Sequence, residues 1–117
     1  MSNNLETFGE FFINEVRDRT IRVFDKRVNG IMKDTGSQEL YKEVQLLNDS
    51  QRGLIHKIIS QVTDLSLHNM LCMFEEHEEV ELVMNGENIT EASDGLSGEL
   101  YTEEGWIKKY SKQRMDV

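Results

Sequence analysis

The sequence predicts a mostly helical α+β fold: a core of about three helices, a small antiparallel β-hairpin and a C-terminal helix. Apolar residues recur at helical spacing over 5–29, 37–47 and 51–77. After Glu79 the pattern changes to alternation and reaches Asn85-Gly86, which is the strongest short hairpin signal between extended runs. These observations together define the fold class.

Length and composition indicate a single domain spanning 1–117, which is large enough for one core and too small for two. The longest nearly apolar run, Met70–Phe74, is too short to span a bilayer. The N-terminus lacks the basic-then-apolar pattern of a secretory signal. The single cysteine, Cys72, excludes an internal disulfide and suits a reducing compartment. We therefore expect a cytoplasmic protein that does not contact membranes.

The helix expected over 5–29 has one apolar stripe, made of Leu5, Phe8, Phe12, Ile13, Val16, Val23 and Phe24. Asn3 is the expected N-cap, and Gly30 is the expected left-handed residue after the last turn. Gly9 lies on the stripe, either because another element approaches its backbone or because the helix tolerates it at a cost of ~1 kcal/mol. Three residues lie off the stripe and would cover a second neighbour or a dimer contact: Phe11, Ile21 and Val28.

Two further helices are expected. The shorter, over 37–47 with Ser37 as its cap, has an apolar face of Leu40, Tyr41, Val44 and Leu47. The longer, over 51–77, is continuous and buries one stripe in its first half: Leu54, Ile55, Ile58, Ile59, Val62 and Leu65. Its second half, with Leu67, Met70, Leu71 and Phe74, is expected to be bent away or buried on most sides.

The last part of the chain combines short elements. A two-residue loop at Asn85-Gly86 would pair Leu82 with Ile89 on the core face, with the return strand over 87–91. A third short strand is expected to end at Tyr101. The final helix would be capped by Thr102 and would bury an apolar face of Trp106, Ile107 and Tyr110, with the tryptophan as a core anchor.

The negative charge of the chain is confined to its second half. Residues 1–58 contain nine bases and nine acids, whereas 59–117 contain four bases and thirteen acids, which gives the net charge of −9. Between Lys57 and Lys108 lie twelve acids and no Lys or Arg. Such a field repels nucleic acid and anionic membranes and attracts basic surfaces. We therefore expect a basic protein partner and no direct binding of nucleic acid.

Nine acids are the expected partner-binding residues: Glu75, Glu76, Glu78, Glu79, Glu81, Asp94, Glu99, Glu103 and Glu104. The densest group, 75–81, lies at the C-terminal end of a helix, where each exposed acid opposes the macrodipole by roughly 0.3–1 kcal/mol. Because these acids destabilise their own helix, we interpret them as residues that bind a partner. The alternative is that the acidic stretch only keeps the protein in solution.

One group of side chains has the residue types of a metal site or a thiol nucleophile. His68 and Cys72 are four residues apart and share a helix face, with Glu75 or Glu76 one turn further, so they could ligate zinc or form a thiol nucleophile. A structural zinc site needs a fourth ligand, and the sequence has no Cys-x-x-Cys motif to supply it. We therefore expect no catalytic residue, metal or cofactor, and keep a small metal or thiol enzyme as an alternative.

Three blocks resemble segments of short bacterial proteins: LHNML at 67–71, DGLSGEL at 94–100 and GWIKKYS at 105–111. Chains of this kind are similar to acidic immunity or antitoxin proteins, which neutralise a basic toxin by covering it. The resemblance implies inhibitor-type binding and assigns no functional residue.

Charge and resemblance together predict a non-enzymatic immunity protein whose anionic half docks on the basic cleft of a toxin, for example a nuclease. A second hypothesis is a nucleic-acid mimic, which needs acids spaced like phosphates along an elongated body. A third is the enzyme around His68 and Cys72. A fourth is a homodimeric scaffold.

Overall fold

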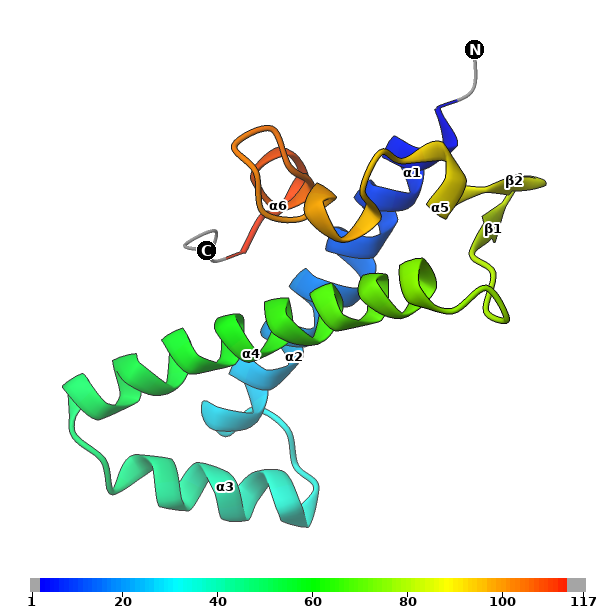
Figure 1. Ribbon diagram of the computed structural model, residues 1–117. Helices are drawn as coiled ribbons and strands as arrows, with labels where there is room; N and C mark the ends of the chain where they lie inside the picture. Colours follow the sequence, from blue (N-terminus) through cyan, green and yellow to red (C-terminus); the bar gives the residue numbers. More distant parts are fainter. Residues whose placement is uncertain (1–2, 114–117) are drawn as a thin grey trace.

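A long N-terminal helix forms one side of the molecule (Figure 1). The structure is a computed structural model that describes residues 3–113. The N-terminal helix consists of three segments without a break between them: α1 (Asn4–Phe11), the π-helical segment η1 (Phe12–Asp18) and α2 (Arg19–Val28). The mostly helical α+β class and the first predicted helix are confirmed.

Both ends of this helix close as predicted. The Asn3 side chain accepts a hydrogen bond from the Glu6 N–H at 3.2 Å, which satisfies one of the unpaired amides of the first turn. At the other end Gly30 has a φ of 79°, the left-handed conformation in which glycine avoids the strain of a Cβ.

The π-helical segment changes which side of the helix is buried. Each N–H in a π-helix bonds to the carbonyl five residues back, so a turn contains more residues than in an α-helix. The side chains after this segment therefore point in a different direction from the one that α-helical spacing predicts. Val16 is therefore exposed, whereas Ile21 and Val28 are buried within the chain. The prediction that Val16 belongs to the buried stripe was wrong, whereas Val23 is half-buried. Of the three off-stripe residues only Phe11 remains exposed.

α3 (Thr35–Gln45) and α4 (Asp49–Glu76) complete the helical frame. α4 is continuous, as predicted, and begins with a capping box at Asn48. The cap of α3 is Asp34 and not Ser37, because the Asp34 carboxylate accepts a hydrogen bond from the Ser37 N–H at 3.1 Å. Hydrogen bonding to Ser37 also lowers the pKa of the Asp34 carboxyl.

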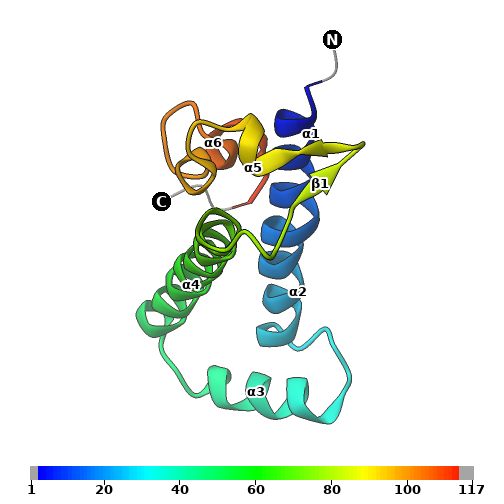
Figure 2. The ribbon, with the colours of Figure 1, turned by 45° about the vertical axis from the view of Figure 1, so that its right-hand side comes forward.

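The helices are splayed at one end and covered at the other. Figure 2 shows α2 and α4 diverging like the arms of a V, with α3 lying across their far ends. The C-terminal segments gather at the opposite end, beside α1 and the last turns of α4 (Figure 1). The main core therefore lies at that second end.

A small hairpin follows α4. β1 (Val83–Met84) and β2 (Glu87–Asn88) pair antiparallel through Asn85-Gly86, whose φ values are 53° and 81°. Both turn residues thus have the positive φ of a type I′ turn. Beyond the strands the Ile89 N–H donates to the Leu82 carbonyl at 2.8 Å, which confirms their predicted pairing.

The chain then leaves the extended conformation earlier than predicted. The Asn88 side chain accepts a hydrogen bond from the Glu91 N–H at 3.1 Å and so caps α5 (Ile89–Ala92). The predicted return strand over 87–91 therefore ends at Asn88. A 3₁₀-helix, η2 (Leu96–Glu99), stands where the third strand was predicted, so that strand is wrong.

The last helix, α6 (Trp106–Tyr110), is shorter than predicted. Thr102 does not cap it, because residues 101–104 form turns and Gly105 occupies the N-cap position. Trp106 and Ile107 are buried, as predicted, and Tyr110 is half-buried. The tryptophan is therefore a core anchor.

The core is built at the covered end. Its buried apolar members are Phe12, Ile13, Leu67, Leu71, Ile89, Leu96, Leu100, Trp106 and Ile107. The Trp106 ring lies against the backbone of Gly9, where an added Cβ would stand 2.5 Å from Cε2. The close packing of Trp106 against this backbone therefore explains why position 9 is a glycine.

A buried ionic cluster joins η1, α4 and the C-terminal segment. Arg17 is fully buried, and its Nε lies 2.5 Å from the Asp64 carboxylate, while its Nη1 donates to Asp18 at 3.2 Å and to the Ser111 hydroxyl at 2.7 Å. The Lys112 N–H also donates to Asp18, at 2.7 Å. The sequence pattern gave no signal for this cluster.

A second polar cluster fixes α6 on α1. The Glu6 carboxylate accepts hydrogen bonds from Lys109 at 2.7 Å and from the Tyr110 hydroxyl at 2.6 Å. These bonds lower the pKa of Glu6. Burial, and then the bond to Glu6, raise the pKa of Tyr110 to about 12. Glu6 thus contacts α6.

The first half of α4 contradicts its predicted burial. Ile55 and Ile59 are only half-buried, and four members of the predicted stripe face solvent, with exposed fractions of 56% for Leu54, 48% for Ile58, 56% for Val62 and 57% for Leu65. Further along, Leu67 and Leu71 are buried but Met70 and Met73 are exposed, so burial on most sides was also wrong. Because α2 and α4 diverge, no element within residues 3–113 covers this side of α4.

Candidate partner-binding site

The nine predicted partner-binding acids are spread over five segments. Glu75 and Glu76 lie in the last turn of α4, and Glu78, Glu79 and Glu81 lie in the loop before the hairpin. The other four are in the C-terminal part: Asp94 after α5, Glu99 in η2, and Glu103 and Glu104 before α6. All are exposed except Glu99, which is half-buried.

Three of these acids meet in one hollow. It measures about 460 Å³ and is lined by Phe74, Glu75, Glu78, Val80, Glu81, Asn88, Thr90 and Glu91. Its lining contains four carboxylates and no Lys or Arg. We call it the acidic hollow. Glu91 was not among the selected acids, because sequence distance gave no sign that α5 returns to the end of α4.

The local sequence explains how the hollow forms. His77 ends α4 with an extended backbone, φ −127° and ψ 104°, and a turn closes when the Val80 N–H donates to the His77 carbonyl at 3.2 Å. The type I′ turn then reverses the chain, so that α5 comes back beside the loop. Glu78 and Glu91, thirteen residues apart, therefore line the same hollow.

The carboxylates of the hollow differ in their availability. Glu75 accepts a hydrogen bond from the Ser97 N–H, so it also holds η2 against α4. Within residues 3–113, no hydrogen bond or ion pair engages the side chains of Glu78, Glu81 or Glu91. The Thr90 hydroxyl is buried and has no hydrogen-bond partner in that same range. Three carboxylates are thus available to a cationic group.

The acids outside the hollow have separate environments. The Ser93 hydroxyl donates to Glu99 at 3.1 Å, so this carboxylate stabilises the turn between α5 and η2. The acidic hollow is not lined by the other five acids, Glu76, Glu79, Asp94, Glu103 and Glu104.

His68 and Cys72 lie together on α4, as their spacing predicts. The sulfur is 3.8 Å from Nδ1 and 3.9 Å from Nε2, and both residues are half-buried. The His68 ring packs on the Tyr101 ring, with centroids 5.4 Å apart. Within residues 3–113 no group of three or more His, Cys, Asp or Glu side chains is arranged to hold a metal ion.

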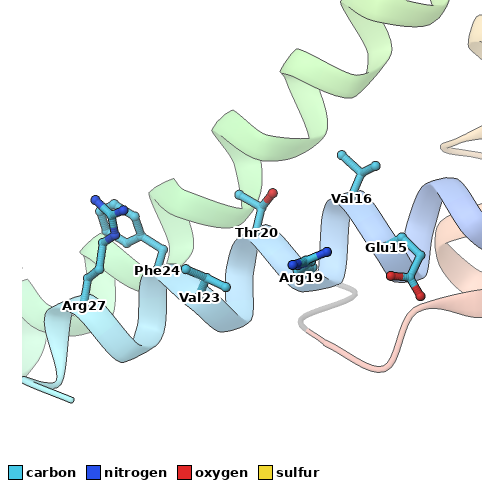
Figure 3. A pocket seen from close by; sticks show the side chains of 7 residues that line it. All are labelled: Glu15, Val16, Arg19, Thr20, Val23, Phe24 and Arg27. Atoms are coloured by element: carbon cyan, nitrogen blue, oxygen red, sulfur yellow. The ribbon is translucent and has the colours of Figure 1, made fainter. Parts of the chain in front are cut away.

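A second hollow lies on the N-terminal helix. It measures about 380 Å³, and all of its lining residues come from η1 and α2: Glu15, Val16, Arg19, Thr20, Val23, Phe24 and Arg27 (Figure 3). The two arginines make it the opposite of the acidic hollow in charge. Because one helix supplies every lining side chain, it is a groove along that helix and not an enclosed site.

No family model, no curated protein and no solved structure matches this chain. The immunity or antitoxin class therefore stays a prediction from the three sequence blocks. In the described part of the chain, none of the helices is long and apolar enough to cross a bilayer.

Proposed function

We propose that this chain is a non-enzymatic binding protein of the immunity type, which neutralises a basic toxin in the cytoplasm by covering its active cleft. The observation that supports this most is the acidic hollow, where Glu78, Glu81 and Glu91 are free to accept a cation. A lysine or arginine of the partner would enter the hollow and meet several carboxylates at once. Each such contact is a charge-assisted hydrogen bond.

The wider acidic half would act at longer range. Its remaining carboxylates would attract a basic surface before contact, which speeds association and makes it depend on salt. Phe74 and Val80 supply the apolar part of the lining. Affinity would then come from desolvated contacts in and around the hollow, because exposed charge pairs contribute only ~0–1 kcal/mol each.

The nucleic-acid mimic has less support. A mimic needs acids along its long axis, and the longest element here is α4. From Gly53 to Phe74 this helix has one acid, Asp64, which is buried against Arg17. The acids are instead concentrated around one end of the helix, which suits a compact basic cleft better than a DNA-binding groove.

A pull-down from the bacterial host of the gene tests the proposal. The bait is the full chain, compared with a triple variant Glu78→Gln, Glu81→Gln and Glu91→Gln. The matched control carries Glu10→Gln, Glu39→Gln and Glu43→Gln, three exposed acids of the neutral half. We expect a basic protein that is retained by the chain and the control, and is lost with the triple variant.

The captured protein must also be harmful when the binding protein is absent. Its expression alone should stop growth, and co-expression of the chain should restore growth while the triple variant does not. A captured protein that is harmless, or that both variants retain equally, would contradict the proposal.

A further inference from the structure

The exposed side of α4 is an apolar stripe that the other described residues of the chain do not cover. Leu54, Ile58, Val62 and Leu65 are spaced by four, four and three residues, and each exposes about half of its surface (48–57%). This is the heptad-like spacing of a helix that packs along another helix. The sequence therefore has the apolar spacing of a buried helix face, yet the described residues of the single chain leave this face exposed.

The overall dimensions also differ from those of a compact monomer. The radius of gyration is 16.7 Å, with extents of 50 × 29 × 26 Å, whereas about 13.4 Å is typical for a compact domain of this length. The accessible surface is 7608 Å², against about 6,600 Å² for a monomer of this mass. The difference of roughly 1,000 Å² is close to the share of about 800 Å² that each partner buries in a standard interface.

The charge around the stripe permits self-association. Between Gly53 and Phe74 the charged residues are Lys57 and the buried Asp64. Lys57 is exposed, and the neighbouring polar residues Gln61, Ser66 and Asn69 are uncharged. Two copies can therefore bring these faces together without placing like charges opposite each other, although each chain has a net charge of −9.

We propose that a second copy of this chain covers the stripe, with the two α4 helices packed antiparallel about a two-fold axis near residue 60. An isologous interface of this kind places Ile58 of one copy against Val62 of the other. We choose the antiparallel arrangement because it keeps the acidic hollows of the two copies far apart. From residue 60 to Glu76 a helix rises about 24 Å, so the two acidic ends would lie about 48 Å apart.

That separation is several times the screening length of about 8 Å at physiological salt, so the acidic ends would not repel each other. A parallel pair would instead bring both acidic ends together. The dimer would thus present two acidic hollows at its opposite ends. This inference does not depend on the proposed function, since it concerns a different surface.

Sedimentation equilibrium of the full chain tests the dimer. We expect twice the chain mass of 13.6 kDa. The double variant Ile58→Lys and Val62→Lys should sediment as a monomer with unchanged helical circular dichroism. The matched control is Phe11→Lys with Val83→Lys, whose parent residues are 55% and 53% exposed but lie off the stripe. It should remain dimeric. A monomeric parent chain, or a dimer that survives in the stripe variant, would overturn the proposal.

Disulfide trapping in a Cys72→Ser background tests the orientation. In the antiparallel pair, residue 61 of one copy lies beside residue 61 of the other copy. The two residues at position 69 lie about 27 Å apart along the helix axis. A disulfide needs Cα atoms within about 7 Å. Oxidation should therefore cross-link Gln61→Cys and leave Asn69→Cys uncross-linked. Cross-linking at both positions would indicate a parallel pair and reject the arrangement.

Discussion

Arg17 and Asp64 form an ion pair in the interior, with 2.5 Å between Nε and the carboxylate and exposed fractions of 0% and 4%. Removing one partner leaves an uncompensated buried charge, which typically costs ~3–5 kcal/mol. We therefore expect Asp64→Ala to lower the free energy of unfolding by about that amount, measured by urea titration. The control for removal of a negative charge is Asp49→Ala. Asp49 also pairs with an arginine, Arg52, but its side chain is almost fully exposed.

A loss below ~1 kcal/mol in Asp64→Ala would mean that water or Asp18 compensates Arg17 fully. In that case the cluster would not hold η1, α4 and the C-terminal segment together.

The contact between Gly9 and Trp106 gives a second prediction. An alanine at position 9 would place its Cβ 2.5 Å from the indole, so the ring must move. Overpacking of this kind costs ~1–3 kcal/mol. The fluorescence of the chain's single tryptophan should shift to longer wavelength, because the displaced ring meets water.

Gly53→Ala is the matched control for that substitution. Gly53 also lies inside a helix, but apart from its chain neighbours and the local helix backbone no described atom lies within 4 Å of the position its Cβ would take. Alanine there should stabilise the protein by up to ~1 kcal/mol without changing the fluorescence. Equal effects of the two substitutions would show that helix propensity, and not the Trp106 contact, determines the cost at Gly9.

The pair of Tyr110 and Glu6 predicts the alkaline stability of the protein. The pKa of Tyr110 is raised from 10.0 to about 12 in the folded state, so folding favours the protonated phenol. Its contribution to stability is complete below pH 10 and is lost as the pH rises through about 12. Denaturant titrations should show a decrease over this interval that is smaller in Tyr110→Phe. The same decrease in both proteins would show that other groups cause it.

Local signals in the sequence were enough for much of the helical frame. Asn3 and Gly30 marked helix ends correctly, because caps depend on neighbouring residues alone. Asn85-Gly86 likewise identified the hairpin. Ser37 and Thr102 were wrong as caps, since Asp34 and Gly105 take those positions.

Features that depend on tertiary packing were not predictable from local pattern. The π-helical segment rotates the buried face of the N-terminal helix, so Ile21 is inside and Val16 is outside. Periodicity identified the stripe on α4 correctly as apolar, but could not show whether this chain or another copy covers it. Glu91 joins the acidic hollow only because the hairpin returns the chain to α4.

The central claim is that the acidic hollow binds cationic side chains. The most direct test is an NMR titration of the ¹⁵N-labelled chain with a hexa-arginine peptide at low and high salt. We expect saturable shifts concentrated at residues 74–91, and at least an approximately tenfold loss of affinity in the triple variant Glu78→Gln, Glu81→Gln and Glu91→Gln. Shifts spread evenly over Glu99, Glu103 and Glu104 as well, with the same affinity in the triple variant, would contradict the claim.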